Sequence, residues 1–412
     1  MREIFSLLLC CAAACWLAPP RAVAAEGGRG SEARLVAFGD LHGDLFRCRQ
    51  LLRLANVTDA NDRWIAGSSI VVQLGDVADR GRHPHKIYDL FASLEQQAKA
   101  AGGEFIFLIG NHELMNLLGE HSYVHPDAMA AFGGAEAYAA AFSPQGPYGS
   151  YILQHPVSVV RKGVVFVHAG ITPAYAARGV GYINAELTKH FSRERHHTAS
   201  KDTTNGEEHP FSDSDSPLWS RTILSEAKQG NCSLLRESLR LLSMQEVSAG
   251  RLPVHMMVGG HSVQAGGAIA VECNGSLVGA DVGLSRSVYL SAGYVAYVEL
   301  VPDASDPPRL VAQPRYPFGR GVRAPAPSLL GGPVQPPRCT QAVRCPSPAG
   351  GGNRELAALP RAGRGNERSG SAGLLAPHYH LLFVLAGLSL VCLVRLRRRR
   401  PTGGRHRGVC GH

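Results

Sequence analysis

The chain of 412 residues lacks several patterns that assign proteins to familiar classes. It contains ten cysteines but no Cys-x-x-Cys pair, which excludes a zinc-ribbon domain. Its formal net charge of +9 comes from arginines toward the carboxyl end, whereas residues 26–300 carry a slight excess of acidic side chains. Nucleic-acid binding requires cations clustered on a folded face, so we expect no nucleic-acid partner. No internal repeat is evident.

The amino terminus has the features of a secretory signal. Arg2 precedes the apolar run Phe5–Leu17, and Ala22-Val23-Ala24 supplies a small-x-small cleavage pattern. We therefore predict a signal peptide over residues 1–24. The alternative interpretation is a buried amino-terminal helix.

A second apolar run, Leu381–Val394, lies near the carboxyl end and is followed at once by Arg395 and then by Arg397–Arg400. The run is shorter than the ~20 residues of a typical spanning helix, but flanking arginines can extend to the membrane interface. We predict a single transmembrane helix over 378–394 and a basic cytoplasmic tail over 395–412. An interfacial helix is the alternative, and the basic end disfavours a GPI signal.

These two ends predict a single-pass protein of the secretory pathway or the cell-surface membrane, with its large domain lumenal or extracellular. Three glycosylation sequons agree with that prediction and indicate a glycoprotein; they begin at Asn56, Asn231 and Asn274.

Five cysteines lie between the two apolar ends. Cys232 with Cys273 is one candidate disulfide, and Cys339 with Cys345 is another. The sequence alone does not fix the connectivity, and the fifth member, Cys48, makes the set odd.

Residues 32–300 are predicted to form the folded domain, and the Pro-, Gly- and Arg-rich residues 301–376 to form a linker that buries little core. Short apolar runs alternate with helical spacing in the first part of the domain, which indicates an α/β fold. The predicted strands there are Leu35–Phe38, Ile70–Leu74 and Glu104–Ile109, and the predicted helices are Asp44–Ala55 and His85–Ala101; further strands are expected at Val164–Val167, Val254–Val258 and Tyr294–Leu300. Two less regular insertions, His121–Tyr151 and Arg178–Pro217, are expected to form lids or substrate walls.

Metal-ligating side chains follow three of these strands directly. Asp40 and His42 come after the first strand, Asp76 after the second and Asn111 after the third, at intervals of 36 and 35 residues. That spacing is about one strand–helix–strand unit, so we expect these side chains to meet at one edge of a sheet. His168 and His261 follow two later apolar runs in the same way.

These donors are sufficient to hold two divalent cations. A bridging carboxylate is shared between two cations about 3.5–4 Å apart, and we assign that role to Asp76. One metal would take Asp40, His42 and Asp76, and the other would take Asp76, Asn111, His168 and His261. A water or hydroxide between the cations would attack phosphorus in line. The mixed oxygen and imidazole set suits Mn²⁺ best, with Fe or Zn²⁺ as possible alternatives.

The catalytic groups are expected beside these ligands. His112 follows Asn111 and is our candidate general acid, with Asp79 as the carboxylate that orients it. Arg80 is placed to grip phosphate oxygens. Arg221 is a candidate second clamp, although an arginine after a tryptophan is as often a surface stack.

The motifs resemble those of the phosphoprotein phosphatase family of calcineurin-like metallophosphoesterases, with the match covering about residues 34–300. They are Gly39–Asp44 (GDLHGD), Gly75–Gly81 (GDVADRG), Gly110–Glu113 (GNHE), His168–Gly170 (HAG) and Gly259–His261 (GGH). The resemblance implies a metallophosphoesterase fold with a central β-sandwich flanked by helices. It also implies that the six residues named above are the metal ligands and that His112 is the general acid.

Three segments look most similar to the Shewanella-like subgroup: Gly110–Asn116, Leu218–Arg221 and Gly260–Gln264. Members of that subgroup hydrolyse phosphoprotein monoesters, and some favour phosphotyrosine. The sequence departs from the eukaryotic Ser/Thr enzymes, with Ala78 in place of Val, Ala169 in place of Gly, and no tyrosine-rich carboxyl motifs.

We therefore predict a membrane-anchored, metal-dependent phosphomonoesterase that acts on phosphoproteins or phosphopeptides. A nucleotide or dinucleoside polyphosphate hydrolase of the same fold is the first alternative. A non-catalytic phosphatase-like glycoprotein is the second.

Overall fold

The computed structural model describes residues 34–197, 211–288, 293–305 and 309–324. The predicted signal peptide, transmembrane helix and basic tail lie outside these ranges, as does the candidate pair of Cys339 and Cys345. Within the described ranges, no helix is long and apolar enough to cross a membrane.

The first sheet contains the three predicted strands in parallel. Strands β1 (Leu35–Phe38), β2 (Ile70–Gln73) and β3 (Glu104–Phe107) lie side by side, and all four residues of β1 and of β2 are buried. The order in the sheet is β10-β9-β1-β2-β3, with β9 (Tyr297–Pro302) antiparallel to both β1 and β10 (Leu310–Arg315). The loops after β1, β2 and β3 therefore leave the same edge of the sheet, as expected.

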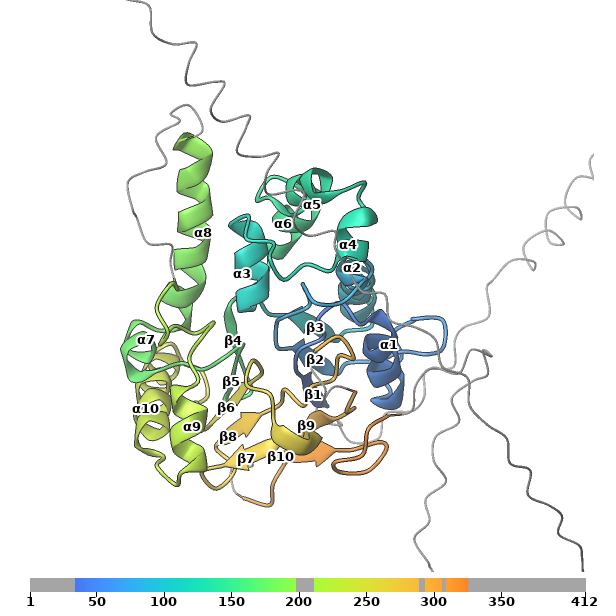
Figure 1. The fold of residues 1–412 in the computed structure, drawn as a ribbon. Coiled ribbons are helices and arrows are strands. Elements are labelled where there is room, and N and C mark those ends of the chain that lie inside the picture. The colour runs from blue at the N-terminus through green and yellow to red at the C-terminus, as the bar shows by residue number, and fades with distance from the viewer. Residues whose placement is uncertain (1–33, 198–210, 289–292, 306–308, 325–412) are drawn as a thin grey trace, which may run out of the picture. The chain divides into compact units, whose positions relative to one another are not determined.

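The second sheet repeats this pattern of parallel central strands. Strands β5 (Val164–Val167), β6 (Met256–Gly259) and β8 (Leu277–Gly279) are parallel, with β4 (Ser158–Arg161) and β7 (Ala270–Glu272) added antiparallel at the two edges. Both sheets contribute to one hydrophobic core (Figure 1). The two-sheet arrangement that the resemblance implied is thus present.

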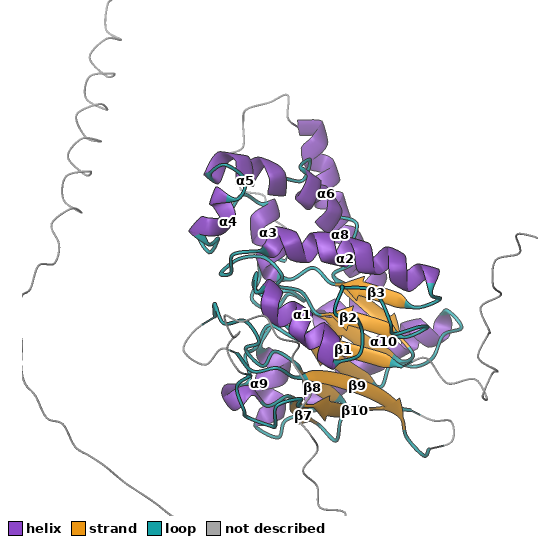
Figure 2. Cartoon of the chain, turned by 90° about the vertical axis from the view of Figure 1, so that its right-hand side faces the viewer, coloured by secondary structure: helices purple, strands orange, loops and turns teal. Residues whose placement is uncertain are grey.

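Helices flank the sheets (Figure 2). Helices α1 (Leu45–Leu54) and α2 (Pro84–Ala100) contact each other, and α2 packs on β3, whereas α8 (Val180–His197) contacts β4 and α9 (Thr222–Lys228) contacts β7 and β8. The Asp44 side chain caps α1 by accepting from the Arg47 amide, and Pro84 opens α2 where a helix needs no amide donor. The remaining helices are α3 (Asn111–Leu117), α4 (Pro126–Ala130), α5 (Ala135–Phe142), α6 (Pro147–Ile152), α7 (Pro173–Arg178), α10 (Ser233–Ser248) and the 3₁₀ turn η1 (Ala265–Gly267).

The loops that follow β1 and β2 are hydrogen-bonded to each other. The amides of Leu41 and His42 both donate to the Asp76 carbonyl, at 3.0 and 2.9 Å. Gly81 is required at the next crossing, because a Cβ there would lie 2.1 Å from the His42 carbonyl oxygen. The two motifs predicted to bind metal are therefore fixed against each other by backbone contacts.

Two predictions about organisation need correction. The insertions expected to be irregular are largely helical: His121–Tyr151 contains α4, α5 and most of α6, and Arg178–Pro217 contains α8. Alanine-rich segments with Pro at a first helical position favour helix, and their aromatic side chains pack into the core.

The predicted linker also begins too early. Strand β10 lies wholly inside the region assigned to the linker, and the Ala324 amide still donates to the Gly293 carbonyl at 2.9 Å. Leu310 is buried and Val311 is exposed, so this edge strand has a buried face toward the core. The Pro-rich composition of the region concealed this pattern in the sequence.

One of the two candidate disulfides lies within the described residues and is formed there. Cys232, just before α10, is bonded to Cys273 in the turn between β7 and β8. Cys48 is buried as a free thiol.

Candidate metal centre and catalytic groups

Five of the six predicted metal ligands line one cavity of about 350 Å³. The sixth, His168, does not line it but contacts Asp76, with its Nε2 3.3 Å from Asp76 Oδ1. Asp40, His42 and Asp76 come from the loops after β1 and β2 of the first sheet, and Asn111 is the first residue of α3, which follows β3. His168 and His261 follow β5 and β6 of the second sheet. All six side chains are buried.

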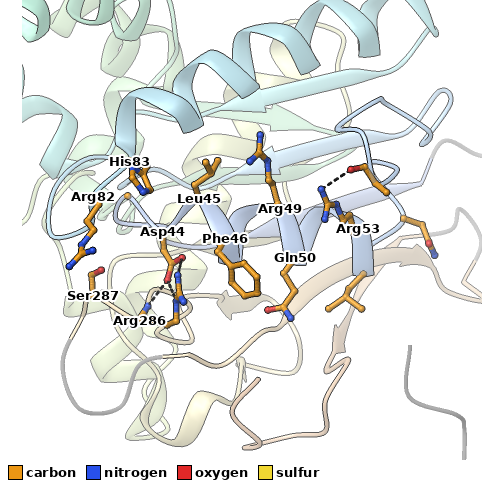
Figure 3. Close-up of a pocket in the computed structure, with 14 residues that line it drawn as sticks. Asp44, Leu45, Phe46, Arg49, Gln50, Arg53, Arg82, His83, Arg286 and Ser287 are labelled. Carbon is orange, nitrogen blue, oxygen red and sulfur yellow. Dashed lines mark hydrogen bonds and ion pairs between the residues drawn. The ribbon is translucent and has the colours of Figure 1, made fainter. Parts of the chain in front are cut away.

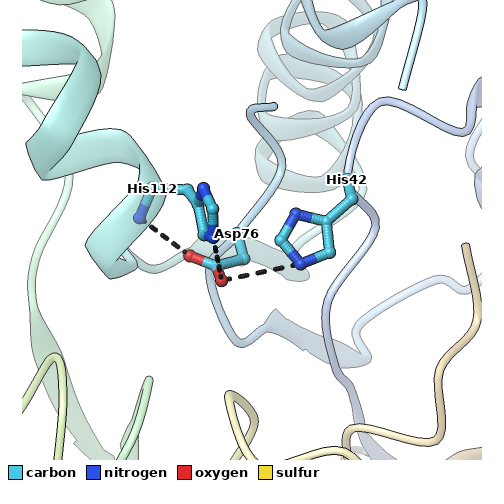
Figure 4. A group of neighbouring side chains, drawn as sticks. All are labelled: His42, Asp76 and His112. Carbon is cyan, nitrogen blue, oxygen red and sulfur yellow. Dashed lines mark hydrogen bonds and ion pairs between the residues drawn. The ribbon is translucent and has the colours of Figure 1, made fainter. Parts of the chain in front are cut away.

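Asp76 lies at the centre of this arrangement (Figure 4). Its Oδ2 is 3.7 Å from His42 Nε2 and 3.9 Å from His112 Nε2, and its Oδ1 is 3.3 Å from His168 Nε2. Two ligand atoms that each bind one cation at about 2.0–2.2 Å are separated by roughly 3–4 Å. One Asp76 oxygen therefore faces the imidazoles of His42 and His112, and the other faces those of His168 and His261.

The imidazoles that surround Asp76 have their tautomers fixed by backbone carbonyls. His42 Nδ1 lies 3.1 Å from the Ala78 oxygen and His168 Nδ1 lies 2.7 Å from the Leu74 oxygen. A carbonyl only accepts, so Nδ1 carries the proton and Nε2 keeps its lone pair toward the cavity. His261 is reversed: Nε2 donates to the Trp219 carbonyl at 3.2 Å, which leaves Nδ1 as the donor atom.

Burial and charge set the protonation of these rings. Burial lowers the pKa of both His42 and His261 to about 3, which keeps them neutral as a metal ligand requires. Burial also lowers the pKa of His168, but the Asp76 charge and the hydrogen bonds to that ring outweigh it, so the net shift is upward. Burial raises the pKa of Asp76, and the neighbouring imidazoles more than reverse that effect.

The geometry around His168 bears directly on whether cations fit. Its Nε2 faces two oxygens, Asn111 Oδ1 at 2.9 Å and Asp76 Oδ1 at 3.3 Å, while its Nδ1 proton is already given to Leu74. Three electron-rich atoms in contact require either a second proton or a cation among them. Together with neutral His42 and His261, this donor set fits divalent cations held by oxygen and imidazole.

A buried carboxyl that the sequence reasoning missed lies beside this set. Asp281 follows β8 and is hydrogen-bonded to Asp40. Burial, together with the charge of Asp76, raises the pKa of Asp281 to about 6. Burial and the charges of Asp281 and Asp76 raise the pKa of Asp40. Asp40 is held in place by the His261 amide, which donates to its Oδ1 at 3.0 Å. If the strand at 277–279 had been predicted from the sequence, Asp281 would have been a candidate ligand, because it follows that strand as the other predicted ligands follow theirs.

His112 and Asp79 form the predicted pair. His112 Nδ1 lies 2.6 Å from Asp79 Oδ2, and the second Asp79 oxygen accepts from Asn116 Nδ2 at 2.8 Å. Asn116 in turn accepts from the Tyr138 hydroxyl of α5 at 2.9 Å. Burial lowers the pKa of His112, but the charges of Asp76 and Asp79 and the Asp79 hydrogen bond raise it overall. His112 Nε2 therefore points toward the cavity on a ring that retains its proton.

The two predicted arginines line the same cavity. Arg80 Nη2 lies 3.4 Å from His112 Nε2, and its guanidinium lies 5.2 Å from the Tyr123 ring centre. Arg221 is exposed at the rim, where Nη1 donates to the His261 carbonyl and to Ser262 Oγ, each at 3.1 Å. Apolar side chains complete the walls, none of which was singled out from the sequence: Met115, Tyr123, Trp219, Val263 and Val288.

Glu113 stabilises the backbone of the site but does not line the cavity. Its Oε2 accepts from the amides of Asp76 and Gly110, and its Oε1 accepts from the amides of Val77 and Ala78 and from the Tyr88 hydroxyl, all at 2.8–2.9 Å. The carboxylate is fully buried. It fixes the turn that carries Asp76.

Several site residues adopt left-handed backbone conformations. The φ angles are +41° for His42, +56° for Asp76, +68° for Asp79, +60° for Arg80 and +59° for His261. Such conformations cost free energy for residues with a Cβ and persist where the surrounding contacts enforce them. Their concentration at this cavity marks it as the functional centre of the described structure.

Comparison with known proteins agrees with this geometry. The family model for calcineurin-like phosphoesterases matches residues 33–264. The chain belongs to this family. It is a phosphatase enzyme, and the resemblance inferred from the motifs is confirmed by relatives from the Shewanella-like group.

Two of those relatives are named Shewanella-like protein phosphatases. Number 2 of Arabidopsis thaliana is 29% identical over 297 residues, which covers 61% of this chain and 72% of the relative. Number 1 of Plasmodium berghei is 31% identical over 154 residues, or 37% of this chain and 42% of the relative.

Among solved structures, a cold-active protein-tyrosine phosphatase of a psychrophilic Shewanella species has a TM-score of 0.51 and 22% identity, covering 66% of this chain and 76% of its own. That similarity shows a shared fold.

Proposed function

We propose that this phosphatase is a protein phosphatase that hydrolyses phosphate monoesters on protein substrates with the help of two divalent cations. The observation that carries the proposal is the position of Asp76, whose two oxygens face two separate groups of imidazoles. The paired acid His112 lies next to the same carboxylate.

Each side chain then has a defined task. Asp40, His42 and Asp76 would hold one cation, and Asp76, Asn111, His168 and His261 would hold the other. Bound cations would lower the pKa of a coordinated water and neutralise charge on the phosphate. The donor set suits Mn²⁺ first, and Fe or Zn²⁺ as alternatives.

The other groups act on the substrate. His112 donates the Nε2 proton to the oxygen of the leaving alcohol or phenol, and Asp79 holds the ring for that transfer. Arg80 and Arg221 lie on the cavity wall and bind the remaining phosphate oxygens.

The walls of the cavity favour an aromatic leaving group. Tyr123 and Val263 are exposed at 48% and 44% although both are apolar, and they stand beside the phosphate-binding Arg80 and Arg221. A phosphotyrosine ring would bury this surface, whereas phosphoserine would leave it in water. We therefore propose phosphotyrosine peptides as good substrates; the structural neighbour from Shewanella is itself named a protein-tyrosine phosphatase.

We further propose that the enzyme works in the secretory pathway or at the cell surface, anchored by residues 378–394. The signal-like residues 1–24 and the cation-flanked apolar run support this location. The Cys232–Cys273 bond supports it as well, because disulfides persist in oxidising compartments.

The test is a substrate panel with the purified full chain. After loading with Mn²⁺, Fe or Zn²⁺, the protein should release phosphate from phosphotyrosine peptides faster than from matched phosphoserine peptides. It should also act more slowly on nucleotides and dinucleoside polyphosphates. Metal-dependent turnover of nucleotides but of no phosphopeptide would establish the alternative hydrolase instead.

A further inference from the structure

A second cavity, of about 1150 Å³, is larger than the catalytic one and has no part in the chemistry described above (Figure 3). We call it the α1 groove. It is lined by Gly43, Asp44, Leu45, Phe46, Arg49, Gln50, Arg53, Leu54, Asn56, Ala60, Arg82, His83, Arg286 and Ser287.

The α1 groove and the catalytic cavity share their walls. His42 lines the catalytic cavity, and the next residue, Gly43, lines the groove. In the same way, Arg80 lines the catalytic cavity and Arg82 lines the groove. Ser287 and Val288 form a third such pair. The Cα of Asp44 is at most about 8 Å from that of His42, two peptide units away. When the phosphate of a substrate protein lies at the metals, the substrate residues next to the phosphorylated one can therefore reach the groove.

The groove is rich in guanidinium groups. Arg49 and Arg53 share one carboxylate, that of Asp62, at 2.7 and 3.3 Å. Arg286 is paired with Asp44 at 2.7 Å and Arg82 with Asp127 at 3.2 Å. The side chains of these four arginines are 40–63% exposed. Four lining guanidiniums are thus paired with three carboxylates, which leaves a positive excess in the groove. The buried Arg47 lies beneath, with its guanidinium 5.5 Å from the Phe46 ring centre.

The positions of the arginines match an extended peptide. Arg49 and Arg53 are one helical turn apart on α1, which separates their side chains by about 6 Å. Alternate residues of an extended chain are about 6.5–7 Å apart and point the same way. The ten residues of α1 make the groove wall about 15 Å long, which suits four or five extended residues better than a compact nucleotide.

We propose that the α1 groove binds an acidic segment of the substrate protein, with Glu or Asp at alternate positions a few residues from the phosphorylated side chain. This inference rests on the proposed protein phosphatase function and adds the sequence context that the enzyme selects. The chain's own segment 325–376 is a poor occupant because it carries more arginines than acids. Phe46, with Arg286 stacked on it at 5.0 Å, provides the apolar floor for the peptide backbone.

The experiment compares two phosphotyrosine peptides with the full chain loaded with Mn²⁺. They are identical except for Glu or Gln at the second, fourth and sixth positions on both sides of the phosphorylated residue. We expect KM to be roughly fivefold to tenfold lower for the Glu peptide, since two exposed ion pairs contribute this much, with similar kcat. The double variant Arg49→Gln/Arg53→Gln should reduce the difference to less than about twofold while p-nitrophenyl phosphate turnover stays unchanged.

Two further variants keep the result decisive. Arg240→Gln, on the exposed face of α10 where Arg240 pairs with Glu237, should retain the full preference. Asp62→Asn frees both arginines and should lower the KM of the Glu peptide further, an effect opposite to that of the double variant. This second test remains informative if the double variant does not fold.

The possible results separate the two hypotheses. Equal KM values for the two peptides in the wild-type chain, or a preference that survives Arg49→Gln/Arg53→Gln, would overturn the groove assignment. Competition by ADP that disappears in the double variant, without any Glu preference, would assign the groove to nucleotides and overturn it too. Absence of metal-dependent turnover of p-nitrophenyl phosphate would instead contradict the proposed function itself.

Discussion

Asp79 holds His112 from behind at 2.6 Å, and its other oxygen is held in turn by Asn116. The imidazole therefore has one orientation, with its Nε2 toward Asp76. We predict that His112→Asn lowers kcat for phosphoserine peptides by about 10²–10⁴, the usual contribution of a general acid. The loss should be much smaller for p-nitrophenyl phosphate, whose leaving group needs no proton. Steady-state kinetics on both substrates test this; equal losses would remove His112 from the acid role.

The pKa of His112 gives a pH dependence with a defined sign. Burial opposes the charged ring, but Asp76 and Asp79 outweigh it and raise the pKa above that of a free histidine. The acid form is thus present at low pH, and kcat should fall as pH rises through the raised pKa. Asp79→Asn removes part of that stabilisation, so the fall should begin at a lower pH. Profiles of kcat against pH for the two proteins provide the comparison, with Glu237→Gln on exposed α10 as an unshifted control.

The proposed bridging role of Asp76 predicts a loss of both metals from one substitution. Asp76→Asn replaces a carboxylate that faces both donor groups with a neutral amide, so we expect metal content to drop from two ions per chain and activity to fall by about 10³-fold or more. Elemental analysis after gel filtration measures the first, and phosphate release the second. Full retention of two ions would show that the carboxylate does not bridge.

Glu113 should be important for stability and not for proton transfer. Glu113→Gln replaces one acceptor oxygen with an amide that faces backbone donors in a buried site. We expect the free energy of unfolding to decrease by about 2–4 kcal/mol. Urea denaturation measures this, and Glu237→Gln, which is exposed, should stay within about 0.5 kcal/mol of wild type.

The disulfide makes a separate prediction about stability. Cys232 and Cys273 are 41 residues apart, and closing a loop of that length stabilises the folded state by about 3–4 kcal/mol. The variant Cys232→Ala/Cys273→Ala should lose that amount in guanidinium unfolding, and a reducing agent should have no further effect on it. A wild-type midpoint that does not respond to reductant would show that the bond is not formed in solution.

The sequence predicted the parts of the site that depend on chain order alone. Asp40, Asp76 and Asn111 each end a parallel strand at regular spacing, and parallel strands deliver their carboxyl ends to one edge. The Asp79–His112 contact could also be predicted, because each partner lies inside a short motif.

Other features depend on contacts that no local pattern contains. Asp281 escaped notice because its strand has only three residues, too short for a periodic signal. Strand β10 was concealed by a Pro-rich composition, although pairing with β9 is sufficient to order it. The α1 groove is formed by α1 together with Arg82 and Arg286, and the latter pair is separated by more than two hundred residues of chain.

The division of the ligands between two sheets has a consequence for biosynthesis. Four donors project from one sheet and two from the other, and His261 arrives 221 residues after Asp40. A nascent chain that has folded only its first half therefore presents the residues proposed for the first cation but lacks His168 and His261, which are proposed for the second. The enzyme would become active only after the last strands have packed against the first, so that hydrolytic activity would indicate a completely folded chain.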